Sequence, residues 1–201
     1  MKRFLFALCL TVLLSPALRA QTVSPEEINK AVKYLEKTRA DVLAATKGLS
    51  EAQWNFKQAT NRWSVAEVTE HIASAEDFLM DMVHNKVMKA PARTEPEDLK
   101  ALDELVLQKI TDRTVKAQAP EPLLPNNRYG SPKDSLKHFQ ESRAKTIAFL
   151  KETKDLRQHA IDGPLGKKLD GYQWVLFIAA HSERHTKQIN EVKADPGFPK
   201  K

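Results

Sequence analysis

The chain has 201 residues, which suits one domain with a sizeable hydrophobic core. It carries 32 lysine and arginine residues against 26 acidic ones, a formal net charge of +6, and no basic run of the kind that binds nucleic acid. The single cysteine, Cys9, lies in the first apolar segment, so neither a disulfide framework nor a cysteine nucleophile is expected in the folded domain.

The first 20 residues have the pattern of a secretory signal peptide. Two basic residues precede an apolar run from residue 4 to residue 14, and small residues follow at Ala17 and Ala20. The run is shorter than the roughly 20 residues that span a bilayer, so no stable membrane span is expected after cleavage. Cleavage after Ala20 leaves one domain, residues 21–201, with a formal net charge of +3 and a periplasmic or secreted location.

Five segments repeat apolar residues every three or four positions, as amphipathic helices do. Three of them open with capping boxes, in which Ser24 pairs with Glu27, Ser64 with Glu67, and Asp170 with Gln173. No segment shows the alternation typical of a strand. We therefore predict an all-α fold, a four-helix bundle with one extra helix at about 97–117. The five expected helices lie at residues 24–45, 64–83, 96–115, 131–153 and 170–194.

The connections between these helices are rich in proline, glycine and short polar residues. Three of them are long, at residues 48–63, 119–130 and 159–169. Glycine and proline clusters interrupt regular structure, so these connections are expected to be irregular. No internal repeat is present, and nothing indicates a second domain.

The last expected helix contains the stretch FIAAHSERHTKQI, in which His181 and His185 interrupt an apolar stripe. Residues four apart lie one turn apart on the same helix face, so two imidazoles at this spacing can reach one ion. Such pairs also occur as ordinary core histidines, and the spacing alone leaves both interpretations open. A metalloprotease H-E-x-x-H motif is excluded, because Ser182 occupies the position where the glutamate would stand.

A third histidine, His71, lies on the apolar face of the second expected helix. A buried polar group costs free energy unless it has a partner, and one shared cation would satisfy three inward-facing imidazoles at once. Neutral imidazole is a good ligand for zinc, nickel, copper and iron. We therefore predict one metal site formed by His71, His181 and His185. The remaining histidines, which lie off the apolar stripes or in a connection, are expected at the surface: His84, His138 and His159.

Two stretches resemble the DinB/YfiT-like superfamily. NRWSVAEVTEHIASAEDFL is similar to its second-helix signature, a W-S motif followed by an inward histidine, and HSERHTKQINEVK is similar to its closing H-x-x-x-H helix. The resemblance covers residues 24–195 and implies a four-helix bundle that binds a divalent metal, commonly nickel or zinc, through three histidines. These positions fall on His71, His181 and His185. The family includes thiol-dependent enzymes of the cytoplasm, so an exported member would lack their cosubstrate unless the thiol is secreted too.

The sequence supports two functional hypotheses. The first is an exported metal-dependent hydrolase or transferase that acts on an unidentified small molecule, because three protein ligands leave a coordination position open for water or substrate. The second is a non-catalytic metal- or ligand-binding bundle, in which the ion ties two helices together. A bundle without metal is the third and plainest alternative. A homodimer is compatible with the sequence, and no nucleic-acid partner is expected.

Several further residues have both a functional and a structural interpretation. Arg143 breaks an apolar stripe and either holds a substrate carboxylate or pairs with Glu70 or Glu76. Asp77 and Glu183 are candidates for a general base or for ordinary surface acids. No general base stands out, so catalytic residues stay unknown. Three aromatic residues either rim a pocket or pack in the core: Tyr129, Tyr172 and Trp174.

Overall fold

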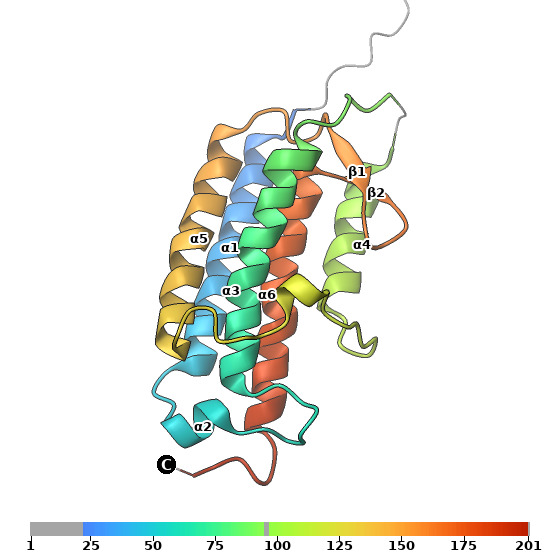
Figure 1. The fold of residues 1–201 in the computed structure, drawn as a ribbon. Helices are drawn as coiled ribbons and strands as arrows, with labels where there is room; N and C mark the ends of the chain where they lie inside the picture. Colours follow the sequence, from blue (N-terminus) through green and yellow to red (C-terminus); the bar gives the residue numbers. More distant parts are fainter. Residues whose placement is uncertain (1–21, 95–96, 201) are drawn as a thin grey trace, which may run out of the picture.

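Four long helices pack side by side in a bundle, and a fifth lies outside it (Figure 1). The computed structural model describes residues 22–94 and 97–200. The predicted signal peptide, residues 1–20, lies outside the described residues. The bundle helices are α1 (Pro25–Thr46), α3 (Val65–Met82), α5 (Pro132–Glu152) and α6 (Gly171–Lys193), and α4 (Leu99–Thr111) packs against α6. The predicted all-α bundle with one extra helix is confirmed. Among the described residues, no helix is long and apolar enough to cross a membrane.

Capping boxes fix where three of the bundle helices begin. The Ser24 hydroxyl accepts the Glu27 backbone N–H, while the Glu27 carboxylate accepts the Ser24 N–H at 2.7 Å. The same reciprocal arrangement opens α3 at Ser64 and α6 at Asp170. Each box satisfies backbone donors that a helix leaves unpaired, which is why the sequence alone located these starts.

The extra helix is shorter than predicted. α4 ends at Thr111 rather than at about residue 117. The carboxylate of Asp112 accepts the backbone N–H of Thr114 at 2.8 Å and its hydroxyl at 2.7 Å. This local turn competes with helical hydrogen bonding and ends the helix.

All three connections that were expected to be irregular contain short regular elements, and the one at residues 119–130 contains a single turn, η2 (Glu121–Leu123). α2 (Glu51–Asn55) begins with a capping box of Ser50 and Gln53. The strands β1 (Ala160–Asp162) and β2 (Lys168–Asp170) pair antiparallel, with Ile161 opposite Leu169. The expectation of no strand was therefore wrong for these residues. Strands of three residues are too short to show a period, and Gly166, at φ 65°, supplies the left-handed turn between them.

A buried polar layer divides the apolar core midway along the bundle. Leu35, Leu79, Ile147 and Ile178 belong to one cluster of buried side chains, and Val42, Ile72, Phe139 and Ile189 to the other. Among the buried polar residues between these positions, one from each bundle helix belongs to a hydrogen-bonded set centred on Arg143: Thr38, Glu76, Arg143 and Ser182. We call these four residues the arginine layer.

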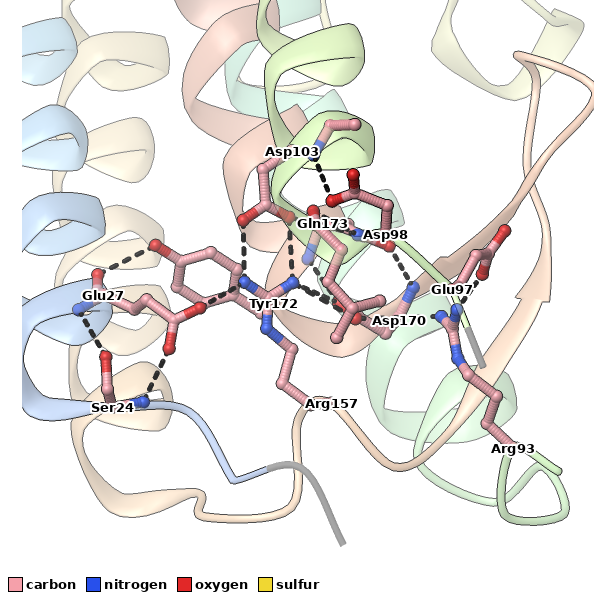
Figure 2. A network of polar contacts seen from close by, with 12 residues as sticks. Ser24, Glu27, Arg93, Glu97, Asp98, Asp103, Arg157, Asp170, Tyr172 and Gln173 are labelled. Carbon is pink, nitrogen blue, oxygen red and sulfur yellow. Dashed lines mark hydrogen bonds and ion pairs between the residues drawn. The ribbon is translucent and has the colours of Figure 1, made fainter. Parts of the chain in front are cut away.

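A second polar network fixes the start of α6 against α1 and α4 (Figure 2). The Arg157 guanidinium contacts Glu27 at 2.6 Å, Asp103 at 2.7 Å and Asp170 at 3.2 Å, and lies 4.1 Å from the centre of the Tyr172 ring. Asp170 is also the N-cap of α6. This contact therefore sets where the helix bearing two of the three histidines begins.

Candidate metal centre

The three predicted histidines meet in the bundle, on α3 and α6. The Nε2 atom of His181 lies 3.3 Å from Nε2 of His71 and 3.1 Å from Nε2 of His185. One ligand atom from each ring can be chosen so that all three lie within 4.8 Å of one another. His71 and His185 are buried and His181 is partly buried. The spacing of four residues within α6 and the packing of α3 on α6 together produce this convergence.

Outer hydrogen bonds fix the protonation of two of these rings. Nδ1 of His71 lies 3.0 Å from the Leu123 carbonyl oxygen, which can only accept, so Nδ1 of His71 carries the hydrogen. Nδ1 of His185 lies 2.9 Å from Oε1 of Gln188 and carries a hydrogen by the same reasoning. In the neutral rings both Nε2 atoms are then unprotonated.

The cluster is consequently short of hydrogen-bond donors. Neutral His181 has one proton, which can serve Nε2 of His71 or Nε2 of His185 but not both. At least one buried lone pair is left without a donor, which is unfavourable. A cation shared by the three Nε2 atoms would satisfy all of them.

Protonating the rings does not resolve the shortage. Burial lowers the pKa of His71 below its ordinary value of 6.5. Burial lowers the pKa values of His181 and His185 much further, and each ring also opposes a positive charge on its neighbour. The three imidazoles are therefore neutral at pH 7, the form in which histidine binds metals.

The separations match those of ligands around one ion. Two nitrogen atoms at about 2.0–2.1 Å from a tetrahedral zinc ion lie about 3.3–3.4 Å apart. The observed 3.1 and 3.3 Å are close to this value. The residues present thus fit a divalent cation held by three neutral imidazoles.

Arg143 does not belong to this centre. It is fully buried, and its guanidinium contacts both Glu76 carboxylate oxygens at 2.7 and 2.8 Å. It also donates to the hydroxyls of Thr38 and Ser182 at 2.8 and 2.7 Å. The interpretation of Arg143 as a partner of Glu76 is confirmed, and its donors are not directed at a substrate.

The two acids considered as general bases are engaged elsewhere. Glu183 accepts the Tyr34 hydroxyl at 2.8 Å and pairs with Lys187 at 2.9 Å. Asp77 contacts His138 and Ser142, each at 2.5 Å. Within the described residues, no carboxylate hydrogen-bonds to any of the three site imidazoles. Neither acid is therefore placed as a base at the centre.

The remaining candidates lie in the core or near the surface. Tyr172 is buried beneath Arg157, and Trp174 is buried against Phe177. Tyr129 stacks on His138 at 4.4 Å between ring centres. His84 is exposed, whereas His138 and His159 are partly buried and take part in polar contacts at 2.5 and 2.6 Å.

Sequence reasoning missed the groups that hold the site histidines. Gln188 follows His185 by three residues, so helical spacing could have identified it. The Leu123 carbonyl and the Trp63 ring, whose centre lies 4.9 Å from that of His71, come from irregular segments. No periodic signal indicates where such segments fold back.

Comparison with known proteins agrees with this architecture. The family model described as the DinB superfamily matches residues 34–189. The chain is 31% identical over 165 residues to the uncharacterized protein YuaE of Bacillus subtilis, covering 81% of this chain and 96% of that protein. YfiT of Bacillus subtilis, described as a probable metal-dependent hydrolase with an unusual four-helix bundle topology, has a similar fold. That match has a TM-score of 0.55 at 19% identity and covers 89% of this chain and 93% of the YfiT chain. This chain is a member of the DinB superfamily.

Proposed function

We propose that this protein is a metal-dependent enzyme, a hydrolase or transferase, in which His71, His181 and His185 bind one divalent ion. The observation that carries the proposal is the convergence of three neutral Nε2 atoms, 3.1 and 3.3 Å apart, with too few protons to satisfy one another. Zinc and nickel are the favoured ions, because both suit a set of three imidazoles. The description of YfiT as a probable metal-dependent hydrolase supports the same class of function.

The arrangement suits catalysis because three protein ligands leave room for a fourth. A divalent ion there would supply Lewis acidity, which polarises a carbonyl group or lowers the pKa of a coordinated water to about 7. The protein's own contribution is to hold the imidazoles neutral and correctly oriented. The Leu123 carbonyl and Gln188 do this by accepting the Nδ1 hydrogens of His71 and His185.

One observation favours the second candidate function, a non-catalytic metal- or ligand-binding bundle. In the part of the chain that the structure describes, no carboxylate contacts the site imidazoles as a general base would. Two open cavities, of about 560 and 220 Å³, lie along α3, and none of the three histidines lines either of them. An ion at this position would still join α3 to α6.

Metal analysis of single variants tests the site. The purified wild-type protein is expected to hold about one divalent ion per chain by elemental analysis after zinc or nickel loading. His71→Ala and His185→Ala should each reduce this to background. His84→Ala changes an exposed histidine outside the site, so this control variant should retain the ion. Full metal occupancy in both site variants would contradict the proposal.

An activity screen separates enzyme from binding module. Metal-loaded protein is assayed against small esters, amides and electrophiles, with and without added thiols. Turnover by wild type that disappears in His71→Ala supports the enzyme. Turnover that requires the added thiol identifies a transferase, and turnover without thiol a hydrolase. Stoichiometric metal without turnover on any substrate supports the binding module.

We also propose that the bundle acts after export, in the periplasm or outside the cell. The support is the charged, apolar and small-residue pattern of residues 1–20. Export would separate the protein from cytoplasmic thiols and so favours the hydrolase over a thiol transferase. Mass spectrometry of the protein from fractionated cells tests this. A chain that retains residues 1–20 in the cytoplasmic fraction would contradict it.

A further inference from the structure

The connection between α4 and α5, residues 112–131, crosses the two helices that carry the site histidines (Figure 1). Midway it forms a single turn, η2 (Glu121–Leu123), which contacts α3. The Leu123 carbonyl that accepts the Nδ1 hydrogen of His71 belongs to this turn. The position of an irregular segment therefore decides the orientation of one site imidazole.

Glu70 fastens this segment to α3. Its side chain is buried, and its two carboxylate oxygens accept three consecutive backbone N–H groups, those of Asn126, Asn127 and Arg128, at 2.9, 3.0 and 3.1 Å. Asn127 has a φ of 62°, which lets successive N–H groups point at one anion. A carboxylate is the one side-chain group with enough acceptor sites for this task.

Arg128 links Glu70 to η2, because its side chain contacts both of them. Its Nη2 atom donates to the carbonyls of Pro122 and Leu124 at 2.9 and 3.0 Å, on either side of Leu123. Its Nε atom lies 3.5 Å from the Glu70 carboxylate. Glu70 is thus linked to the carbonyl that orients His71 without touching His71 through its own side chain.

A second attachment orients His185. Nη1 of Arg113 donates to Oε1 of Gln188 at 3.1 Å, the same atom that accepts the Nδ1 hydrogen of His185. Arginine can only donate, so Arg113 fixes the Gln188 amide with its oxygen toward His185. Arg113 is itself held by Glu191, through contacts of 3.0 and 2.6 Å.

We propose that Glu70 and Arg113 are positioning residues of the metal centre. Each fixes the acceptor that keeps a hydrogen on Nδ1 of one histidine, Glu70 for His71 and Arg113 for His185, and so keeps Nε2 of that ring available as a ligand. The inference rests on the proposed metal site. Groups that orient a histidine ligand from behind typically contribute about 10- to 100-fold to metal affinity.

The test compares zinc affinities of Glu70→Gln and Arg113→Met by competition with a chromophoric chelator. Each variant is expected to bind zinc about 10- to 100-fold more weakly than wild type. Glu141→Gln on the exposed face of α5 and Arg39→Met on α1 remove the same chemical groups elsewhere and should leave the affinity unchanged. The two variants act on different histidines, so either one tests the inference if the other fails to fold.

A second measurement distinguishes orientation from general destabilisation. Imidazole ¹⁵N spectra of the metal-free proteins, assigned with His71→Gln and His185→Gln, should show Nδ1–H for both rings in wild type. Glu70→Gln should shift the His71 signals toward the other tautomer and leave His185 unchanged, and Arg113→Met should do the reverse. Wild-type zinc affinity or unchanged tautomers in both variants would overturn the inference while leaving the metal site intact. Failure of wild type itself to bind zinc would instead overturn the proposed function.

Discussion

Two buried polar clusters lie back to back on α6, and they differ in how completely they satisfy themselves. Ser182 belongs to the arginine layer, where Arg143 finds Glu76, Thr38 and Ser182 as acceptors at 2.7–2.8 Å. The Nε2 atom of the neighbouring residue, His181, contacts the Nε2 atoms of two other imidazoles, those of His71 and His185. In the first cluster, the Arg143 guanidinium has a hydrogen-bond acceptor for its donors, and the Glu76 carboxylate offsets its charge. In the second cluster, the unprotonated ring nitrogens outnumber the protons available to them.

The comparison shows how burial of polar groups separates architecture from function. A closed network needs nothing further and can fix the register of four helices. Buried imidazole nitrogens that lack a hydrogen-bond donor are unfavourable in themselves, and in this bundle a bound cation would give each of them a partner. Burial alone does not distinguish the two clusters, because both lie within the bundle. What distinguishes them is whether every buried donor and acceptor has a hydrogen-bond partner.

The largest expected loss of stability comes from breaking the arginine layer. Arg143→Leu leaves the Glu76 carboxylate buried without a cation and should lower the free energy of unfolding by about 3–5 kcal/mol in urea titrations. Arg143→Leu combined with Glu76→Leu should recover much of this loss, because an apolar pair leaves no charge unmatched. A single variant within about 1 kcal/mol of wild type would show that the arginine layer does not hold the bundle together.

Breaking the network at the start of α6 should have a somewhat smaller effect. Arg157→Leu removes the nearer cation from fully buried Asp170, which keeps Arg93 at 3.7 Å. Glu27 and Asp103 keep access to solvent, so we expect a loss of about 2–4 kcal/mol. Burial raises the pKa of Asp170 to about 6 even beside Arg157, and removing Arg157 raises it further.

This pKa gives the loss a definite pH dependence. Folded Asp170 then holds a proton that the unfolded chain, with an aspartate pKa of about 3.9, has released, so stability falls as pH rises. Arg157→Leu should therefore lose more stability at pH 8 than at pH 5, as measured by urea unfolding at both values. Equal losses at the two pH values would mean that Asp170 does not take up the proton.

Zinc binding to His71, His181 and His185 should stabilise the fold by an intermediate amount. Free zinc at 100 times its dissociation constant adds about 2.7 kcal/mol to the free energy of unfolding. For a chain of this size that corresponds to roughly 5–10 °C in melting temperature. Chelation should remove the gain from wild type and have no effect on His185→Ala. An unchanged wild-type transition would mean that the ion does not bind the folded state preferentially.

The smallest effect is expected where charges pair at the surface. Lys37 and Asp41 lie 2.6 Å apart on α1, with 62% and 37% of their side chains exposed. Lys37→Ala should change stability by no more than about 0.5 kcal/mol, because solvent screens the pair. A loss comparable to that of Arg143→Leu would show that an ion pair stabilises this fold as much at the surface as in the core.

Much of the fold was predictable because its signals are local. The boxes at Ser24, Ser64 and Asp170 located three helix starts, since capping depends on residues three positions apart. The hairpin and α2 escaped prediction because elements of three to five residues show no reliable period. The end of α4 depended on a single Asp112 turn.

The sequence by itself determined the four-helix architecture and placed His181 and His185 on one helix face, because helical periodicity follows from local backbone geometry. It also identified His71 as an inward residue. Only the tertiary structure decided that its ring meets the other two, and that Leu123, Glu70 and Arg113 help to hold two of the rings in place. These contacts join residues as many as 110 positions apart, and their partners are set by packing rather than by any repeat in the chain.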